Sequence, residues 1–301
     1  AIAEADVVLM IGGRLDNQMN FGNPPFFPTG QKLICINGSH EELEHNQAAD
    51  EVLLSDPGAF LDALAGVSRT WDQWFDLQRQ RRGVWVDEWY QHIEEESAKP
   101  GKMHPLQLSL DVQDLMGDED WLIFDGGNTH FWSEIAVNMA GWRGQKLGGI
   151  MHPGNYSLLG VGVSFGVSAK ALNPASNVVV ISGDGAFLSG GLSIEAAFQE
   201  NLPITIVIDN NGGLDCISQQ QERLFANGKH FATDFRDIPF HTMCEGLGGH
   251  GEVVETRDQL RPALERAMAS GKVALVNVKC RGVISPIVAA TSDKRDKASI
   301  E

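Results

Sequence analysis

The sequence predicts an α/β fold: a doubly wound parallel sheet, preceded by the second half of a smaller Rossmann-like α/β domain. Runs that are apolar along their whole length alternate with segments of helical spacing, which is typical of parallel strands covered by helices on both faces. Several of these runs end in glycines with a polar residue among them. Because ligands of such folds bind at the carboxyl ends of the strands, we expect a site there.

The larger domain is predicted at residues 101–283. Its strand candidates are 121–127, 177–185, 204–211 and 273–280, and its helical segments are 105–115, 160–172, 192–200 and 256–270. Residues 284–301 lose this periodicity, and we expect them to be a disordered tail or a lid over the site.

Two further segments are predicted before residue 101. Residues 1–66 hold the strand-like runs VVLMIGG and KLICING and the helical run PGAFLDALAG, as expected for part of a small parallel domain. The chain enters its first strand within a few residues and has no initiator Met, so we expect it to begin inside that domain. Residues 67–100 are expected to be a helical linker, one helix or a pair, that packs its tryptophans on a neighbouring domain: Trp71, Trp74, Trp85 and Trp89.

Composition argues against several classes of function. The net charge of -17 disfavours a surface that follows nucleic-acid phosphates. No apolar run reaches the ~18 residues of a membrane-spanning helix. The cysteines are scattered and form no CxxC pair, which fits a reducing compartment, and we expect a cytoplasmic protein: Cys35, Cys216, Cys244 and Cys280.

The most informative motif places Asp184 between Gly183 and Gly185 at the end of one strand candidate. A helical stretch follows, and a helix N-terminus binds phosphate, which a nearby carboxylate tolerates only through a bridging cation such as Mg²⁺. Asn211 and the backbone carbonyl of Gly213, at the next strand end, could supply further oxygens. The alternative is a helix-capping Asp and a pair of turn asparagines.

Asn211 follows Asp184 by 27 residues, with one helix and one strand between them. This spacing, GDG followed by NN, resembles the signature of thiamine diphosphate (ThDP) enzymes, and the resemblance extends over about residues 5–283. It implies that Mg²⁺ is held by Asp184, Asn211 and Gly213. It also implies that the ThDP diphosphate is bound by residues at these strand ends: Gly183, Gly185, Ala186, Phe187 and Leu214.

Two other segments resemble the same family. FDGGNTHFW at 124–132 is similar to a strand end with diphosphate contacts, which would be Asn128 and Thr129. GNYSLLGVG at 154–162 is similar to the segment under the cofactor, and it implies that Leu159 is the wedge that bends ThDP for catalysis. Three histidines are candidate proton carriers, with a structural role as the alternative for each: His130, His152 and His241.

Residues 1–66 resemble the latter part of the family's middle domain. In relatives that domain binds FAD, the ADP part of coenzyme A, or nothing, and Gly12, Arg14 and Asn37 would lie near such a site. Within the family, the sequence is similar to acetolactate synthases, oxalyl-CoA decarboxylases and 2-hydroxyacyl-CoA lyases. Asp215, Cys216 and Gln220 differ from the synthase pattern, so synthase activity is in doubt.

The resemblance favours a ThDP- and Mg²⁺-dependent lyase or decarboxylase that acts on a 2-hydroxyacyl-CoA or a 2-oxo acid through a C2 ylid and an enamine. An acetolactate synthase-type carboligase is the alternative, and a cofactor-binding or regulatory half that needs a partner chain is the non-enzyme alternative. The family's catalytic Glu belongs to a pyrimidine-binding domain that these residues do not include. We therefore expect that domain in a partner chain or upstream segment, a homo-oligomer (dimer or tetramer), and no turnover by residues 1–301 alone.

Overall fold

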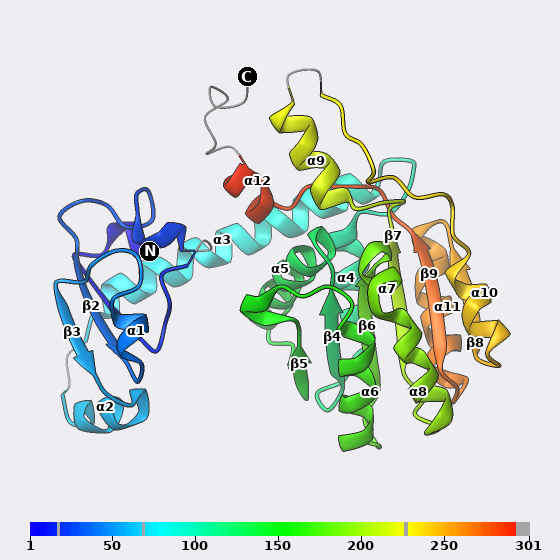
Figure 1. The fold of residues 1–301 in the computed structure, drawn as a ribbon, viewed down its shortest axis with the longest axis horizontal. Helices are drawn as coiled ribbons and strands as arrows, with labels where there is room; N and C mark the ends of the chain where they lie inside the picture. Colours follow the sequence, from blue (N-terminus) through cyan, green and yellow to red (C-terminus); the bar gives the residue numbers. More distant parts are fainter. Residues whose placement is uncertain (17–18, 68–69, 226–227, 293–301) are drawn as a thin grey trace. The chain divides into compact units, whose positions relative to one another are not determined.

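The computed structural model describes residues 1–16, 19–67, 70–225 and 228–292. The chain divides into two compact units, Ala1–Arg82 and Gly83–Glu301 (Figure 1). One helix, α3 (Asp72–Ser97), runs from the first unit into the second. No helix in the described part of the chain is long and apolar enough to cross a membrane.

The first unit contains a parallel sheet of three strands in the order β1 (Val7–Ile11), β2 (Lys32–Asn37) and β3 (Glu51–Leu54). Between the strands lie η2 (Asn20–Gly22) and α1 (His40–Leu43), whereas η1 (Ile2–Glu4) precedes β1 and α2 (Pro57–Leu64) follows β3. The core of this unit is small and gathers on β2: Leu15, Phe27, Leu33, Cys35 and Leu43. The sequence analysis missed β3, because four exposed residues carry no burial pattern.

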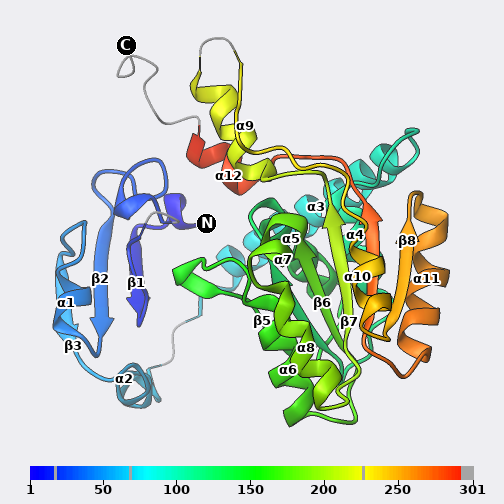
Figure 2. The ribbon, with the colours of Figure 1, turned by 45° about the vertical axis from the view of Figure 1, so that its right-hand side comes forward.

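The second unit contains a parallel sheet of six strands in the order β5-β4-β6-β7-β9-β8 (Figures 1 and 2). The strands are β4 (Trp121–Asp125), β5 (Gly149–Met151), β6 (Val178–Gly183), β7 (Thr205–Asn210), β8 (His250–Val254) and β9 (Ala274–Lys279). The four predicted strands are the inner ones. The two edge strands were missed, because β5 is three residues long and β8 is mostly half-buried and begins with polar residues.

Helices cover both faces of this sheet, so the predicted doubly wound α/β fold is confirmed. One core lies between the sheet and the helices α4 (Pro105–Gln113) and α11 (Arg257–Ala269). The other lies under α6 (Gly162–Leu172), α7 (Asp184–Gly190), α8 (Ile194–Gln199) and α10 (Phe240–Gly246). The remaining elements are α5 (Asn128–Trp142), η3 (Gly154–Tyr156), η4 (Gly191–Ser193), α9 (Asp215–Leu224) and α12 (Pro286–Ser292).

The predicted helical linker contains the single helix α3. Within the second unit, Val86 and Ile93 of this helix are buried in a cluster with Leu106 and Met139. Trp89 joins the cluster and meets Trp132 edge to face at 5.7 Å. The other three tryptophans of this segment are exposed, namely Trp71, Trp74 and Trp85. Of the predicted tail or lid, residues 286–292 form α12, and residues 293–301 lie outside the described part.

Candidate functional site

The site is built where β4, β6 and β7 end, because the carboxyl ends of neighbouring parallel strands meet at one edge of the sheet. β6 ends at Gly183, and α7 begins at Asp184 without any intervening loop. β7 ends at Asn210, and Asn211 begins the loop that leads to α9. The two halves of the predicted motif are therefore adjacent.

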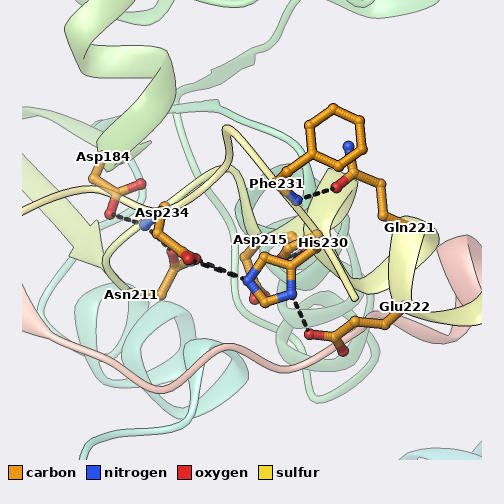
Figure 3. Close-up of polar contacts among 10 residues, drawn as sticks. Asp184, Asn211, Asp215, Gln221, Glu222, His230, Phe231 and Asp234 are labelled. Atoms are coloured by element: carbon orange, nitrogen blue, oxygen red, sulfur yellow. Dashed lines mark hydrogen bonds and ion pairs between the residues drawn. The ribbon is translucent and has the colours of Figure 1, made fainter. Parts of the chain in front are cut away.

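Asp184 is 2% exposed, and both of its carboxylate oxygens accept backbone hydrogen bonds. Oδ1 accepts from the N–H of Gly185 at 2.7 Å. Oδ2 accepts from Gly212 at 2.8 Å and from Gly213 at 3.1 Å (Figure 3). Burial raises the pKa of Asp184 to about 6, because its effect is larger than that of the three backbone hydrogen bonds, which lower the pKa. Since Gly183 is the N-cap of α7, the helix-capping alternative for Asp184 is wrong.

Asn211 and Gly213 complete the loop whose oxygens are the predicted metal ligands. The Asn211 side chain accepts from the N–H of Gly213 at 3.3 Å, so it does stabilise the turn. Gly212 has a φ of 91°, which favours glycine. A side chain at Gly213 would lie 2.5 Å from the carbonyl oxygen of Thr233, so glycine is required there as well. The structure thus brings Asp184, Asn211 and Gly213 together, while their role as Mg²⁺ ligands stays a prediction.

The loop at residues 212–214 is backed by a segment that the sequence analysis did not identify. The N–H of Leu214 donates to the carbonyl of Thr233 at 2.8 Å, and the N–H of Phe235 donates to that of Gly212 at 2.7 Å. His230 lies between two carboxylates, 2.8 Å from Glu222 of α9 and 3.1 Å from Asp234 (Figure 3). These contacts join α9, residues 230–235 and the predicted metal loop.

Asn128 and Thr129 open α5 at the end of β4, but their side chains turn to protein partners. The Thr129 hydroxyl donates to Asp209 at 2.8 Å, inside the sheet. The Asn128 amide donates to Asp215 at 3.3 Å and to Gln219 at 3.0 Å. Both side chains are buried. The predicted diphosphate contacts from this pair can therefore come only from backbone N–H groups unless the side chains rearrange.

Asp209 is a site-adjacent carboxylate that the sequence analysis missed. It is fully buried at the end of β7, and its Oδ1 has no hydrogen-bond partner among the described residues. Burial raises the pKa of Asp209 to about 7. The only signal in the sequence was an acid within an otherwise apolar run, directly before Asn210. Asn210 itself donates to Asn277 at 2.9 Å and has a structural role.

Asp125, the residue that ends β4, holds the segment that contains Leu159. Its Oδ2 accepts from the N–H groups of Gly160 at 2.9 Å and Gly162 at 2.8 Å. Gly160 has a φ of 92°, and its carbonyl fills the space beside Gly190. Leu159 is 40% exposed, so its side chain is accessible to a ligand, and the segment that carries it is held by Asp125. Its role as the wedge stays a prediction.

Comparisons with known proteins identify the family. Residues 125–278 match the C-terminal TPP binding domain of thiamine pyrophosphate enzymes, and residues 1–64 match their central domain. The chain belongs to the thiamine pyrophosphate enzyme family. The family indicates ThDP, which is the same compound as thiamine pyrophosphate, as the cofactor. The resemblance seen in the sequence is confirmed.

The similar proteins include acetolactate synthases and 2-hydroxyacyl-CoA lyases. The chain is 29% identical to a probable acetolactate synthase of Mycobacterium bovis over 280 residues, which are 92% of this chain and 49% of that protein. It is 25% identical to a 2-hydroxyacyl-CoA lyase of Arabidopsis thaliana over 314 residues, 98% of this chain and 52% of that protein. A human 2-hydroxyacyl-CoA lyase 2 is 26% identical over 92% of this chain. The chain spans about half the length of these relatives.

Of the three histidines considered as proton carriers in this member of the thiamine pyrophosphate enzyme family, two lie together. The rings of His130 and His152 are 5.0 Å apart, and both contact Phe124. Burial lowers the pKa of His130 to about 4, which keeps it neutral near pH 7. His241 lies on α10, the helix that packs on β8 and β9. The structure does not bring it together with the other two.

The three residues that differ from the synthase pattern lie on α9. The Asp215 carboxylate accepts from Asn128 and from Gln219, so it is directed at protein groups. Cys216 packs against Gly127, where an added side chain would lie 2.8 Å from its Cβ. Gln220 donates to the Cys216 sulfur at 3.5 Å. Their relation to a substrate stays a prediction.

Arg14 and Asn37, which the sequence analysis placed near a nucleotide site in the first unit, bond to other protein groups. Arg14 pairs with Glu42, with Nε 2.8 Å from Oε2. The Asn37 side chain donates to the carbonyl of Gly13 at 3.3 Å and accepts from Ser39 at 3.0 Å. Gly12 has a φ of 67° where β1 ends. FAD or the ADP part of coenzyme A at this place stays a prediction.

Among the described residues, no group of three or more His, Cys, Asp or Glu side chains could hold a metal ion. The predicted Mg²⁺ site is of a different kind, with one carboxylate, one amide oxygen and one backbone carbonyl. Such a set leaves room for oxygens from the ligand, as Mg²⁺ sites at phosphates commonly do. A buried carboxylate with a raised pKa, beside a loop of close-packed glycines, fits a cation there.

Proposed function

We propose that this chain is the ThDP- and Mg²⁺-binding part of a C–C bond lyase or decarboxylase that acts on a 2-hydroxyacyl-CoA or a 2-oxo acid. The observation that supports it most is the buried Asp184 carboxylate held against the loop at 212–213. Asp184, Asn211 and the Gly213 carbonyl would hold Mg²⁺. Residues at the start of α7, together with Leu214, would line the diphosphate: Gly183, Gly185, Ala186 and Phe187.

Bound ThDP would supply the carbanion chemistry of C–C cleavage. The residues of this chain bind and orient it. Asp125 fixes the backbone of the segment on which Leu159 lies, so Leu159 can act as the wedge that sets the cofactor's shape. The buried groups that orient the cofactor are already hydrogen-bonded within the protein. They would therefore need little rearrangement during the reaction.

A lyase is favoured over a carboligase by one feature of α9. Three residues of α9 differ from the pattern typical of acetolactate synthases: Asp215, Cys216 and Gln220. The side chain of each contacts other protein groups in the structure. Acetolactate synthase activity remains the second candidate, supported by the Mycobacterium bovis relative. A cofactor-binding or regulatory half that needs a partner chain is the non-enzyme candidate.

The chain would need further protein for turnover. The relatives are about twice as long as the matched region. The resemblance implies that the family's catalytic Glu belongs to a pyrimidine-binding domain. We propose that this domain is supplied by a partner chain or an upstream segment, within a homo-oligomer. We expect no turnover from residues 1–301 by themselves, whereas addition of a pyrimidine-binding half should give cleavage of a 2-hydroxyacyl-CoA. Acetolactate formation from pyruvate without cleavage would favour the second candidate.

The binding half of the proposal is tested by titrating ThDP with and without Mg²⁺, using calorimetry and native mass spectrometry. Asp184→Asn should weaken Mg²⁺-dependent binding at least about 100-fold, or about 2.7 kcal/mol. Asp120→Asn is the matched control, because Asp120 is also a buried acid that accepts hydrogen bonds from backbone N–H groups. It lies just before the amino end of β4, whereas the site lies at the carboxyl ends of the strands. The proposal fails if wild type shows no Mg²⁺-dependent binding or if both variants bind alike.

A further inference from the structure

The side chain of Asn128 joins three parts of the chain that are distant in sequence. Its Nδ2 donates to Asp215 at 3.3 Å and to Gln219 at 3.0 Å, both on α9. Its Oδ1 accepts from the backbone N–H of Ser285 at 3.1 Å, in the segment after β9. Asn128 is 5% exposed and Ser285 is 0% exposed. The bond to Ser285 is therefore shielded from water, whereas the two bonds to α9 are partly buried.

The contacts form a closed set. Gln219 donates back to the same oxygen of Asp215 at 2.9 Å, so three side chains bond to one another. The Asn128 amide has two hydrogens and both are used, so no donor remains for a phosphate oxygen. This stoichiometry excludes simultaneous diphosphate binding by the Asn128 side-chain nitrogen while the set is intact.

The backbone on either side of this set is closely packed. A side chain at Gly282 would overlap the Asp215 carboxylate, and one at Gly127 would lie 2.8 Å from the Cβ of Cys216. On the far side of Ser285, the Trp132 indole donates to the carbonyl of Val283 at 2.8 Å. The first turn of α9 is thus in close contact with α5 on one side and with residues 282–285 on the other.

We propose that Asn128 is a positioning residue that locks the first turn of α9, and with it the loop at 211–214, to the segment after β9. This proposal rests on the proposed function for the meaning of that loop. Leu214 is the N-cap of α9, so the oxygens of Asn211 and Gly213 lie directly before the locked turn. A displacement of α9 would shift both oxygens relative to Asp184, whose backbone is fixed at the junction of β6 and α7.

An amide is needed at position 128 because the position must both donate and accept. A carboxylate in its place would face the Asp215 carboxylate in a buried setting, and like charges there cost more than they do in water. If positions 128 and 215 exchange their groups, each bond can re-form in the opposite direction. The Gln219 amide needs only to rotate by half a turn, and the backbone N–H of Ser285 can still donate to a carboxylate at 128.

This exchange gives the decisive experiment, hydrogen–deuterium exchange of the ligand-free chain followed by mass spectrometry. N128D should speed amide exchange in residues 215–220 and 283–288 at least about tenfold. The double variant N128D/D215N should return both segments to within about twofold of wild type. Rescue of this kind distinguishes a specific lock from general loss of packing. The proposal is overturned if N128D changes neither segment or if the double variant exchanges as fast as N128D.

Two further variants keep the result interpretable. N138D introduces the same change on the outer side of α5, where Asn138 donates to the carbonyl of Glu134, and it should leave both segments unchanged. Q219M removes two bonds of the set without adding charge, and it should speed exchange in 215–220 even if N128D does not fold. An unchanged rate in Q219M would also overturn the proposal.

A second arm separates this inference from the proposed function. In the ThDP and Mg²⁺ titration, N128D should bind more weakly, and N128D/D215N should regain wild-type affinity within about threefold. If Asn128 were instead a diphosphate ligand, the double variant would stay weak, because its carboxylate would repel the diphosphate. If wild type does not bind ThDP at all, the proposed function fails, while the exchange experiment still decides the lock.

Discussion

His104 shows how one buried side chain gives this fold a pH dependence. It caps α4, and its Nδ1 accepts from the backbone N–H of Leu106 at 3.0 Å, which requires the unprotonated nitrogen. Burial, and then the nearby Arg281, lower the pKa of His104 to about 4. Its ring also packs on Trp132 at 4.8 Å. Protonation therefore opposes folding at this position.

The first prediction follows from the sign of that shift. The folded pKa of His104 is about 4 and the unfolded value is 6.5, so its contribution is complete above pH 6.5 and is lost as pH falls towards 4. The loss between pH 7.5 and 4.5 should be about 2 kcal/mol. His104→Asn keeps a capping oxygen and cannot titrate, so urea unfolding should show a smaller loss for this variant. Equal losses in the two proteins would contradict the assignment.

At the scale of elements, the site depends on how closely α7 approaches the segment that contains Leu159. The carbonyl of Gly160 occupies the place that a side chain on Gly190 would take, and an added Cβ on Gly166 of α6 would lie 2.5 Å from the side chain of Val180 in β6. Glycine at these contacts lets α7 lie on the backbone at Gly160 and lets α6 lie on the side chains of β6. The position of Leu159 is therefore set by backbone contacts and by Asp125.

The second prediction concerns this contact. Gly190→Ala places a methyl group against a backbone carbonyl that cannot move freely, and it should cost about 1–3 kcal/mol of stability. ThDP affinity should fall with it, because the Leu159 segment must shift. Gly141→Ala is the control, since nothing lies within 4 Å of the added carbon near the end of α5 and stability should rise by up to about 1 kcal/mol. Chemical denaturation of both variants measures the difference, and a neutral Gly190→Ala would refute the prediction.

At the scale of the whole molecule, the two units differ in how well their sheets are protected. Every residue of β6 and β7 is buried, whereas every residue of β3 is exposed. The second unit has three buried clusters of its own, on both faces of its sheet and around α3, and the first unit has one small cluster. Sheets of three strands with little buried apolar surface are marginally stable alone.

The third prediction is therefore that the two units open independently. Amides of β1, β2 and β3 should exchange at least about 100-fold faster than those of β6, β7 and β9, because local opening requires less buried surface to be exposed. Hydrogen–deuterium exchange of the unmodified chain measures this directly. Equal protection in the two sheets would show that they unfold together.

The sequence by itself determined the fold class, the inner strands and the two halves of the site motif. Residues 178–183 and 205–210 are each buried throughout, so they could be recognised as strands from their apolar runs alone. The glycine pair at 212–213 could be recognised from the sequence as well. Gly212 has a positive φ, and Gly213 has no room for a side chain. Constraints of this kind act within a few residues and therefore leave a local pattern.

Only the tertiary structure decided where the polar side chains around the motif point. Thr129 bonds to a residue 80 positions away, and Asn128 bonds to residues 87 and 157 positions away. The sequence analysis expected both as diphosphate contacts, because their partners could not be seen from the local pattern. Contacts between distant segments depend on which strands become neighbours, and no periodicity in the chain records them. That is why the positions of the loop at 211–214 and of Asp184 could be predicted from the sequence, whereas the bonds that fix that loop could not.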